Sequence, residues 1–129
     1  MPEPVVFISH FGVKEGALDD LRRMSKEATE RIREAKPRTV LFLSYLDEEA
    51  GRISFLHAFP DADAMDQHFE GADDRAAAAY EFIEPRGWEF YGRPSEQAME
   101  GMRATAAKFG VPLVVDPEFN AGFLRLGSA

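Results

Sequence analysis

The fold is decided by the stretch from Arg52 to Phe69, which reads RISFLHAFPDADAMDQHF. Its first half, through Phe59, is rich in β-branched and aromatic residues and predicts a strand. Pro60 ends that strand, and the aspartates after it can cap the free amides of a helix and interact favourably with its dipole. Ala62, Met65 and Phe69 then recur at the spacing of one helix face. The stretch therefore predicts a strand that leads directly into a helix.

Three further elements are expected before this stretch. Val5 to Phe11 is almost continuously apolar and predicts a buried strand. The segment from Gly16 to Ala35 has apolar residues three or four apart between charged ones, which predicts an amphipathic helix that ends before Pro37. Thr39 to Leu46 predicts another strand, joined to Arg52 by a short polar hairpin loop.

Two more elements are expected after it. Asp73 and Asp74 can start a second helical piece, hinged near Gly71 and continuing through Ile83. Trp88 to Tyr91 predicts a short strand. The order strand, helix, strand, strand, helix, strand is the split β-α-β arrangement, so we expect an α+β, ferredoxin-like antiparallel sheet with both helices on one face.

An extension follows this core. Ser95 can cap another helix, whose periodic apolar residues continue to Phe109, with Gly110 as its stop. Leu113 to Val115 is a candidate fifth strand, and Phe119 to Leu126 is too hydrophobic for a free tail. We therefore expect one domain over residues 1–129, with a core at 5–92 and a C-terminal extension at 93–129.

Composition excludes several classes of function. The net charge of -8 repels nucleic acid and anionic membranes, and without cysteine there is no disulfide, thiolate nucleophile or zinc-thiolate site. The three histidines are dispersed, so we expect no metal site. The N-terminus has no basic segment leading into an apolar run, and no segment approaches the length of a membrane span, so we expect a cytoplasmic protein.

The strands are apolar on both alternating sides, which bears on assembly. In a ferredoxin-like sheet the helices cover one face only, so the other face would expose several hundred Å² of hydrocarbon at roughly 25 cal/mol per Å². The C-terminal helix could cover it within a monomer. The alternative we favour is a homodimer with the two sheets face to face, which leaves an apolar, ligand-binding pocket between sheet and helices in each subunit.

The chain resembles the antibiotic biosynthesis monooxygenase superfamily over about Val5 to Gly92. The resemblance rests on the strand-end aromatic, acidic turn and helix histidine of the segment from Phe59 to Phe69, together with the strand that ends at Tyr91. It implies a dimeric α/β barrel. It also implies a range of activities: oxygenases without cofactors that act on electron-rich aromatic or quinol substrates, haem-degrading enzymes, and proteins without an assigned reaction.

Two positions argue against the haem branch of this resemblance. The position that haem-degrading relatives fill with asparagine falls near Ser9, and their tryptophan position falls on Phe59. His68 does match their histidine, which could ligate iron, act as a base or orient a substrate. Because of the differences at Ser9 and Phe59, we expect no haem and no other cofactor.

The candidate catalytic residues are His68, His57 and Tyr45. His68 lies beside the apolar helix face, His57 alternates with Phe55 and Phe59 on its strand, and Tyr45 could donate a phenolic proton to a substrate oxygen. A half-solvated boundary position for His68 and a structural role for His57 are the alternatives. The expected substrate-binding residues are Ser9, Phe42, Phe59, Met65 and Trp88.

The leading functional hypothesis is a cofactor-independent monooxygenase acting on a small electron-rich aromatic or quinol-type substrate. His68 or His57 would be the general base, and Tyr45 would stabilise oxyanion charge. A small-molecule-binding dimer without catalytic activity is one alternative, and an isomerase or decarboxylase of the same fold is another.

Overall fold

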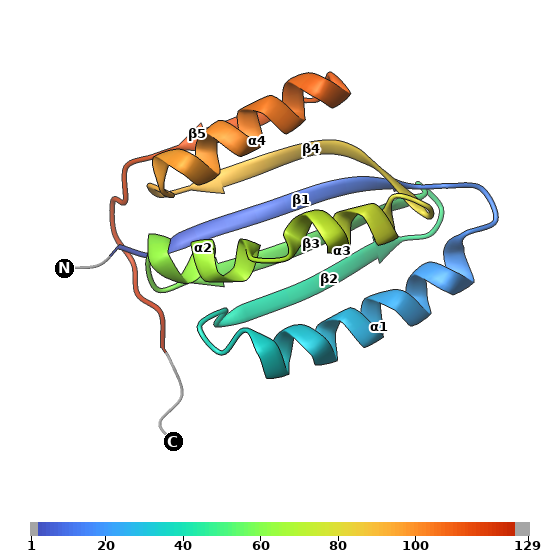
Figure 1. The fold of residues 1–129 in the computed structure, drawn as a ribbon, viewed down its shortest axis with the longest axis horizontal. Helices are drawn as coiled ribbons and strands as arrows, with labels where there is room; N and C mark the ends of the chain where they lie inside the picture. The colour runs from blue at the N-terminus through green and yellow to red at the C-terminus, as the bar shows by residue number, and fades with distance from the viewer. Residues whose placement is uncertain (1–2, 126–129) are drawn as a thin grey trace.

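The computed structural model describes residues 3–125 and contains one five-stranded mixed sheet with four helices, an α+β fold as predicted (Figure 1). The sheet order is β2-β3-β1-β4-β5, in which all neighbours are antiparallel except the parallel pair β4 and β5. The elements in chain order are β1 Val5–Val13, α1 Leu18–Ala35, β2 Leu41–Asp47, β3 Arg52–Phe59, α2 Ala62–Phe69, α3 Ala72–Ala79, β4 Ile83–Tyr91, α4 Glu96–Phe109 and β5 Leu113–Asp116.

The helix ends have the predicted chemistry. The Asp61 carboxylate accepts a hydrogen bond from the Ala64 amide at the start of α2, and the Ser95 hydroxyl accepts one from the Ala98 amide at the start of α4. Gly71 separates α2 from α3 with a φ of 78°, a conformation that favours glycine. The hinge expected near Gly71 is therefore confirmed.

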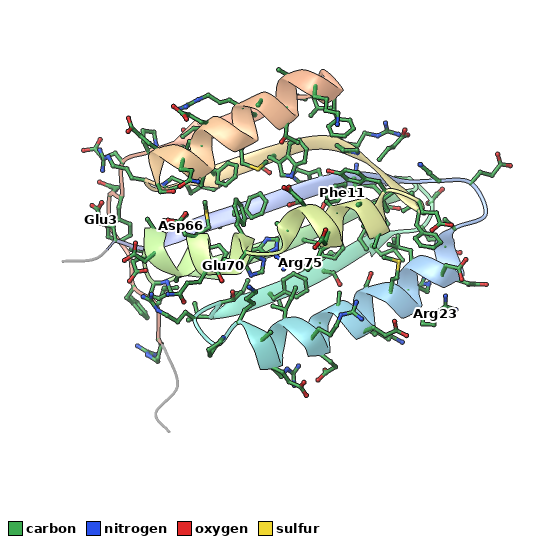
Figure 2. The ribbon with its side chains drawn as sticks, viewed as in Figure 1. Glu3, Phe11, Arg23, Asp66, Glu70 and Arg75 are labelled. Carbon is green, nitrogen blue, oxygen red and sulfur yellow. The ribbon has the colours of Figure 1, made fainter. Side chains whose placement is uncertain are left out.

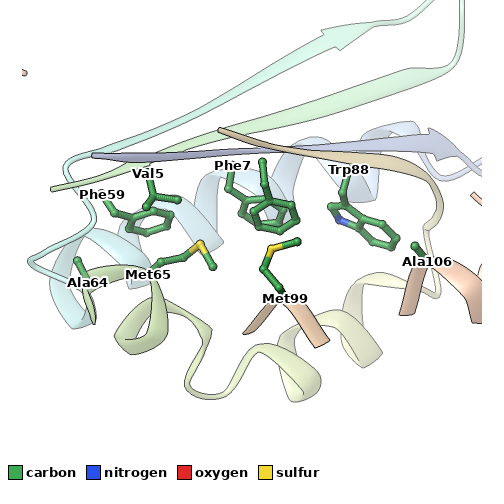
Figure 3. Close-up of a cluster of buried hydrophobic side chains, with 9 residues drawn as sticks. Val5, Phe7, Phe59, Ala64, Met65, Trp88, Met99 and Ala106 are labelled. Carbon is green, nitrogen blue, oxygen red and sulfur yellow. The ribbon is translucent and has the colours of Figure 1, made fainter. Parts of the chain in front are cut away.

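All four helices lie on one face of the sheet (Figures 1 and 3). The main hydrophobic core fills the layer between them, with strand residues such as Phe59 and Phe90 packed against Met65 of α2 and Met99 of α4. The alternative in which the C-terminal helix covers the second face of the sheet is thus wrong, because α4 packs beside α2 on the face that the helices already cover.

The second face of the sheet, here called the open face, is uncovered in the single chain. It presents Leu41, Leu43 and Tyr45 of β2, which are 37%, 41% and 62% exposed, and Val114 of β5. Its centre is polar: the His10 ring hydrogen-bonds the Ser54 hydroxyl and the Glu89 carboxylate, which also accepts from the Tyr91 hydroxyl.

Two sequence expectations differ from the structure. The second helical piece ends at Ala79 and strand β4 already begins at Ile83, although the helix was expected to continue through Ile83 and the strand to begin only at Trp88; β4 thus includes Pro85. The register between β1 and β4 shifts at His10 and Phe11, opposite this proline, so the strand tolerates a residue without an amide donor.

The segment after β5 also differs from expectation. It has no regular secondary structure through Arg125, and Phe123 is 76% exposed rather than buried in this chain; Leu126 lies outside the described residues. None of the helices within residues 3–125 is long and apolar enough to cross a membrane.

Candidate functional site

A cavity of about 270 Å³ lies between the sheet and its helices. Aromatic side chains of the sheet form one wall, and α1 and α3 form the other, where small alanine side chains of α3 leave space. The lining is mostly apolar and comprises Phe7, Ser9, Phe11, Leu21, Met24, Ser25, Ala28, Arg31, Ile32, Phe42, Phe55, His57, His68, Phe69, Ala72, Arg75, Ala76, Ala78, Ala79, Tyr80, Ile83 and Trp88. A concave apolar space with a few polar groups is the usual form of a small-molecule site.

His57 brings a base into this cavity. Strand β3 places it opposite Phe7 of β1, and its ring stacks on the Phe7 ring with a centroid distance of 4.6 Å. Its Nδ1 lies 3.1 Å from the Phe7 carbonyl oxygen. A carbonyl oxygen can only accept, so Nδ1 carries the proton. Burial lowers the pKa of His57 to about 4, so the ring is neutral near pH 7 and Nε2 has a free lone pair.

The free nitrogen of His57 faces accessible space. Within residues 3–125, Nε2 makes no hydrogen bond. In the same residues, every side-chain nitrogen or oxygen that is fully buried has a hydrogen-bond partner, so Nε2 cannot be fully buried. Because His57 lines the cavity, Nε2 is open to whatever the cavity holds.

His68 is the second histidine of the site. Helix α2 carries it, and its Nδ1 lies 2.8 Å from the Thr39 hydroxyl. Burial lowers the pKa of His68 to about 3, with further lowering by the charges of His57, Arg75 and Lys36. Its ring centroid is 5.0 Å from that of His57. His68 also lines a polar surface groove of about 350 Å³ beside residues 35–39, so it separates this groove from the apolar cavity.

Five of the eight predicted site residues line the cavity. These are His57, His68, Ser9, Phe42 and Trp88. The half-solvated alternative for His68 does not hold, because its side chain is buried.

Three predicted site residues lie elsewhere. Phe59 and Met65 are fully buried in the main core, where β3 packs against α2, and do not line the cavity. Tyr45 is on the open face, because β2 points it away from the helices, and is therefore not positioned to stabilise an oxyanion in this cavity.

The sequence reasoning did not identify several cavity residues. Thr39 was assigned only to a strand, although its hydroxyl holds His68. Arg75 and the alanines around it were considered only as a helix. The available signal for the cavity was the run of alanines from Ala76 to Ala79, since alanines at successive helix positions leave room rather than fill a core; nothing in the sequence distinguished Arg75.

Together, these elements define the fold class. The chain has the ferredoxin-like fold of the antibiotic biosynthesis monooxygenase superfamily, so the resemblance seen in the sequence is confirmed at the level of fold. No known family model matches the chain, and no curated protein sequence matches it.

Solved structures supply the particular similarities. MupZ from Pseudomonas fluorescens is 10% identical, with a TM-score of 0.72 over 98% of this chain and 99% of that one. SnoaB, a cofactor-independent oxygenase from Streptomyces nogalater, is 14% identical, with a TM-score of 0.59 over 72% of this chain and 95% of that one. A proposed antibiotic biosynthesis monooxygenase from Deinococcus radiodurans is 14% identical, with a TM-score of 0.59 over 70% and 93%. The similarity to MupZ thus spans the C-terminal extension as well as the core.

Proposed function

We propose that this chain is a cofactor-independent monooxygenase that oxidises a small, electron-rich aromatic or quinol-type compound. The observation that carries the proposal is the unprotonated Nε2 of His57, held in an apolar aromatic cavity by the bond from Nδ1 to the Phe7 carbonyl. The cofactor-independent oxygenase SnoaB has the same core fold.

The proposed reaction needs a base, a binding site and O₂. His57 removes a proton from an activated CH₂ group of the substrate, and the resulting anion transfers electrons to O₂ and forms a hydroperoxide. Loss of water from the hydroperoxide leaves a carbonyl, so CH₂ and O₂ become C=O and H₂O. The protein binds the substrate, accepts the proton and excludes bulk water with Trp88, Phe55 and Phe42.

His57 is a better base than His68 on geometric grounds. Its tautomer is fixed by an acceptor that cannot donate, whereas the Thr39 hydroxyl can either donate to or accept from His68. His68 is then the neighbour that can receive or return a proton 5.0 Å away, measured between ring centroids.

The test is O₂ consumption by the purified, metal-stripped protein with a panel of quinols, anthrone-type compounds and polyphenols. We expect uptake above the spontaneous rate that falls about 100-fold or more in His57→Gln. His10→Gln is the matched control, because His10 lies on the open face of the same sheet. Full uptake in both His57→Gln and His68→Gln would refute the assignment.

A second candidate is an O₂-independent proton transfer, as in an isomerase or decarboxylase. The two adjacent neutral imidazoles favour it, because one can take a proton and the other can return it. Product formation under anaerobic conditions would identify this reaction. Stabilisation of the protein by a ligand without formation of any product would instead indicate a small-molecule-binding protein without catalytic activity.

We also propose that the protein is a homodimer joined through the open faces of two sheets. The exposed Leu41, Leu43 and Val114 support this proposal, because a solvated face with this composition is unfavourable. The superfamily resemblance implies the same pairing. In such a dimer the cavities lie outside the interface, one on the helix-covered side of each sheet.

A further inference from the structure

The charged side chains that line the cavity are positive, whereas the net charge of the protein is negative. The chain has a net charge of -8, yet none of the described residues that line the cavity is Asp or Glu. Two of them, Arg31 of α1 and Arg75 of α3, are cationic. The cavity wall therefore carries positive charge in an acidic protein.

These two arginines also differ from most others in the chain. Of the eleven arginines, seven form ion pairs with carboxylates within the described part of the chain. Neither Arg31 nor Arg75 pairs with a carboxylate among residues 3–125. Arg31 is an exposed lining residue of α1, whereas Arg75 is partly buried.

Arg75 is the more informative of the two. Its guanidinium donates to the backbone carbonyls of His68 and Glu70 at the end of α2, on the helix-covered face of the sheet (Figure 2). Those two bonds leave three of its five N–H groups for other acceptors. Burial lowers the pKa of Arg75, and its charge in turn lowers the pKa of both His57 and His68. A partly desolvated cation is stabilised by an anionic partner, and the described residues 3–125 provide none at this wall.

We propose that the ligand of this cavity is a small amphipathic carboxylic acid, bound as its anion. Its carboxylate lies at Arg75, with the exposed Arg31 as the second cation of the lining, and its apolar body lies among the aromatic side chains of the sheet, beside His57 and Trp88. The inference rests on the proposed use of this cavity as the substrate site, and it adds the substrate's charge.

The arrangement has a chemical consequence. A carboxylate at Arg75 restores neutrality at the wall where positive charge now opposes protonation of His57. The bound acid therefore raises the proton affinity of the base beside it. A neutral substrate of the same shape fills the cavity without this effect.

The experiment compares two probes of matched shape, 4-phenylbutanoate and 4-phenylbutanamide. Trp88 is the single tryptophan of the chain and lines the cavity, so its fluorescence reports binding. In the wild type we expect the acid to bind about tenfold more tightly than the amide, with a preference that weakens at high ionic strength. In Arg75→Gln the two probes should bind within about twofold of each other, whereas Arg75→Lys should keep most of the preference.

Two further variants make the result decisive. Arg103→Gln, an exposed arginine of α4 outside the cavity, should retain the full preference for the acid. Arg31→Gln should lower the preference for the acid about threefold. If Arg75→Gln binds neither probe because the end of α2 has lost its cap, the result for Arg31→Gln tests the proposal instead. Equal binding of acid and amide by the wild type, or an unchanged preference in both Arg75→Gln and Arg31→Gln, would overturn the inference.

This experiment is independent of the proposed reaction. It measures equilibrium binding of compounds that are not oxidised, so a preference for the acid can stand even if no substrate consumes O₂. Conversely, the two probes could bind equally while O₂ uptake still depends on His57. That result would support the proposed oxygenase function and refute the proposal that its substrate carries a carboxylate.

Discussion

The imidazole rings of His57 and His68 lie 5.0 Å apart, centroid to centroid, at an interplanar angle of 74°. They come from a strand and a helix of the same β-α unit, and burial keeps both neutral at pH 7. Two neutral imidazoles therefore lie next to each other in one apolar cavity, and their protonation can be measured directly.

The buried histidines should make stability depend on pH. The pKa of His57 is about 4 in the folded chain and 6.5 ordinarily, so the unfolded chain binds protons first as the pH falls. This contribution to stability is complete above pH 6.5 and is lost as the pH falls to about 4. Between about pH 7 and 4.5, the free energy of unfolding should therefore fall by about 2 kcal/mol less in His57→Gln than in the wild type. Urea unfolding at several pH values measures this difference, and parallel curves for the two proteins would contradict it.

The tautomer of His57 is a second prediction. Because the Phe7 carbonyl accepts from Nδ1, the proton should reside on Nδ1 and not on Nε2 at pH 7. Long-range ¹H–¹⁵N spectra of protein labelled at histidine nitrogen distinguish the two tautomers, and His57→Gln identifies the signals. A proton found on Nε2 would remove the free base from the cavity and, with it, the main support for the proposed chemistry.

Two glycines should respond to alanine in opposite directions. Gly92 follows β4 with a φ of 101°, and an added Cβ would lie 2.7 Å from the Pro4 carbonyl oxygen, so Gly92→Ala should cost about 2 kcal/mol or more. Gly101 lies inside α4 with open space around it, so Gly101→Ala should stabilise the protein by about 0.5–1 kcal/mol. Chemical denaturation measures both. A cost at Gly101 would indicate that this surface of α4 is covered in solution.

The open face should control the oligomeric state. Leu43→Asp introduces a charge into the proposed interface at a side chain that is 41% exposed in the single chain, so it should give a folded monomer. Gln97→Asp adds the same charge on exposed α4 and should leave the dimer intact. Sedimentation velocity gives the masses. A wild-type monomer, or a dimeric Leu43→Asp protein, would exclude this interface.

The sequence predicted the core of the fold because local signals and long-range order agree there. Strand β3 was predicted from Arg52 to Phe59 as the structure has it, and the caps at Asp61 and Ser95 mark real helix starts. The start of β4 was missed because Pro85 usually excludes a strand, and only the partner strand shows that the register shifts beside it. The position of α4 is a packing result that no local pattern contains.

The site was predicted less completely, for a geometric reason. In β2 the apolar residues occupy both faces, so hydrophobicity alone could not indicate which face meets the helices. Strand alternation separates Phe42 from Tyr45, and only Phe42 reaches the cavity. Phe59 and Met65 point into the layer between the sheet and its helices but are enclosed in the main core, which residue spacing alone cannot distinguish from the cavity. Arg75 was missed because its significance lies in the lack of a carboxylate partner, which is a property of three-dimensional surroundings.

The bond from His57 to the Phe7 main chain has an evolutionary consequence. The oxygen that fixes the position of the histidine proton belongs to the backbone of β1, so no side-chain replacement at position 7 can delete it. Selection could therefore change the size and aromatic character of the cavity wall while the base kept the same free nitrogen. Substrate choice and basicity are thus separable in this scaffold, so one sheet could support a succession of different specificities.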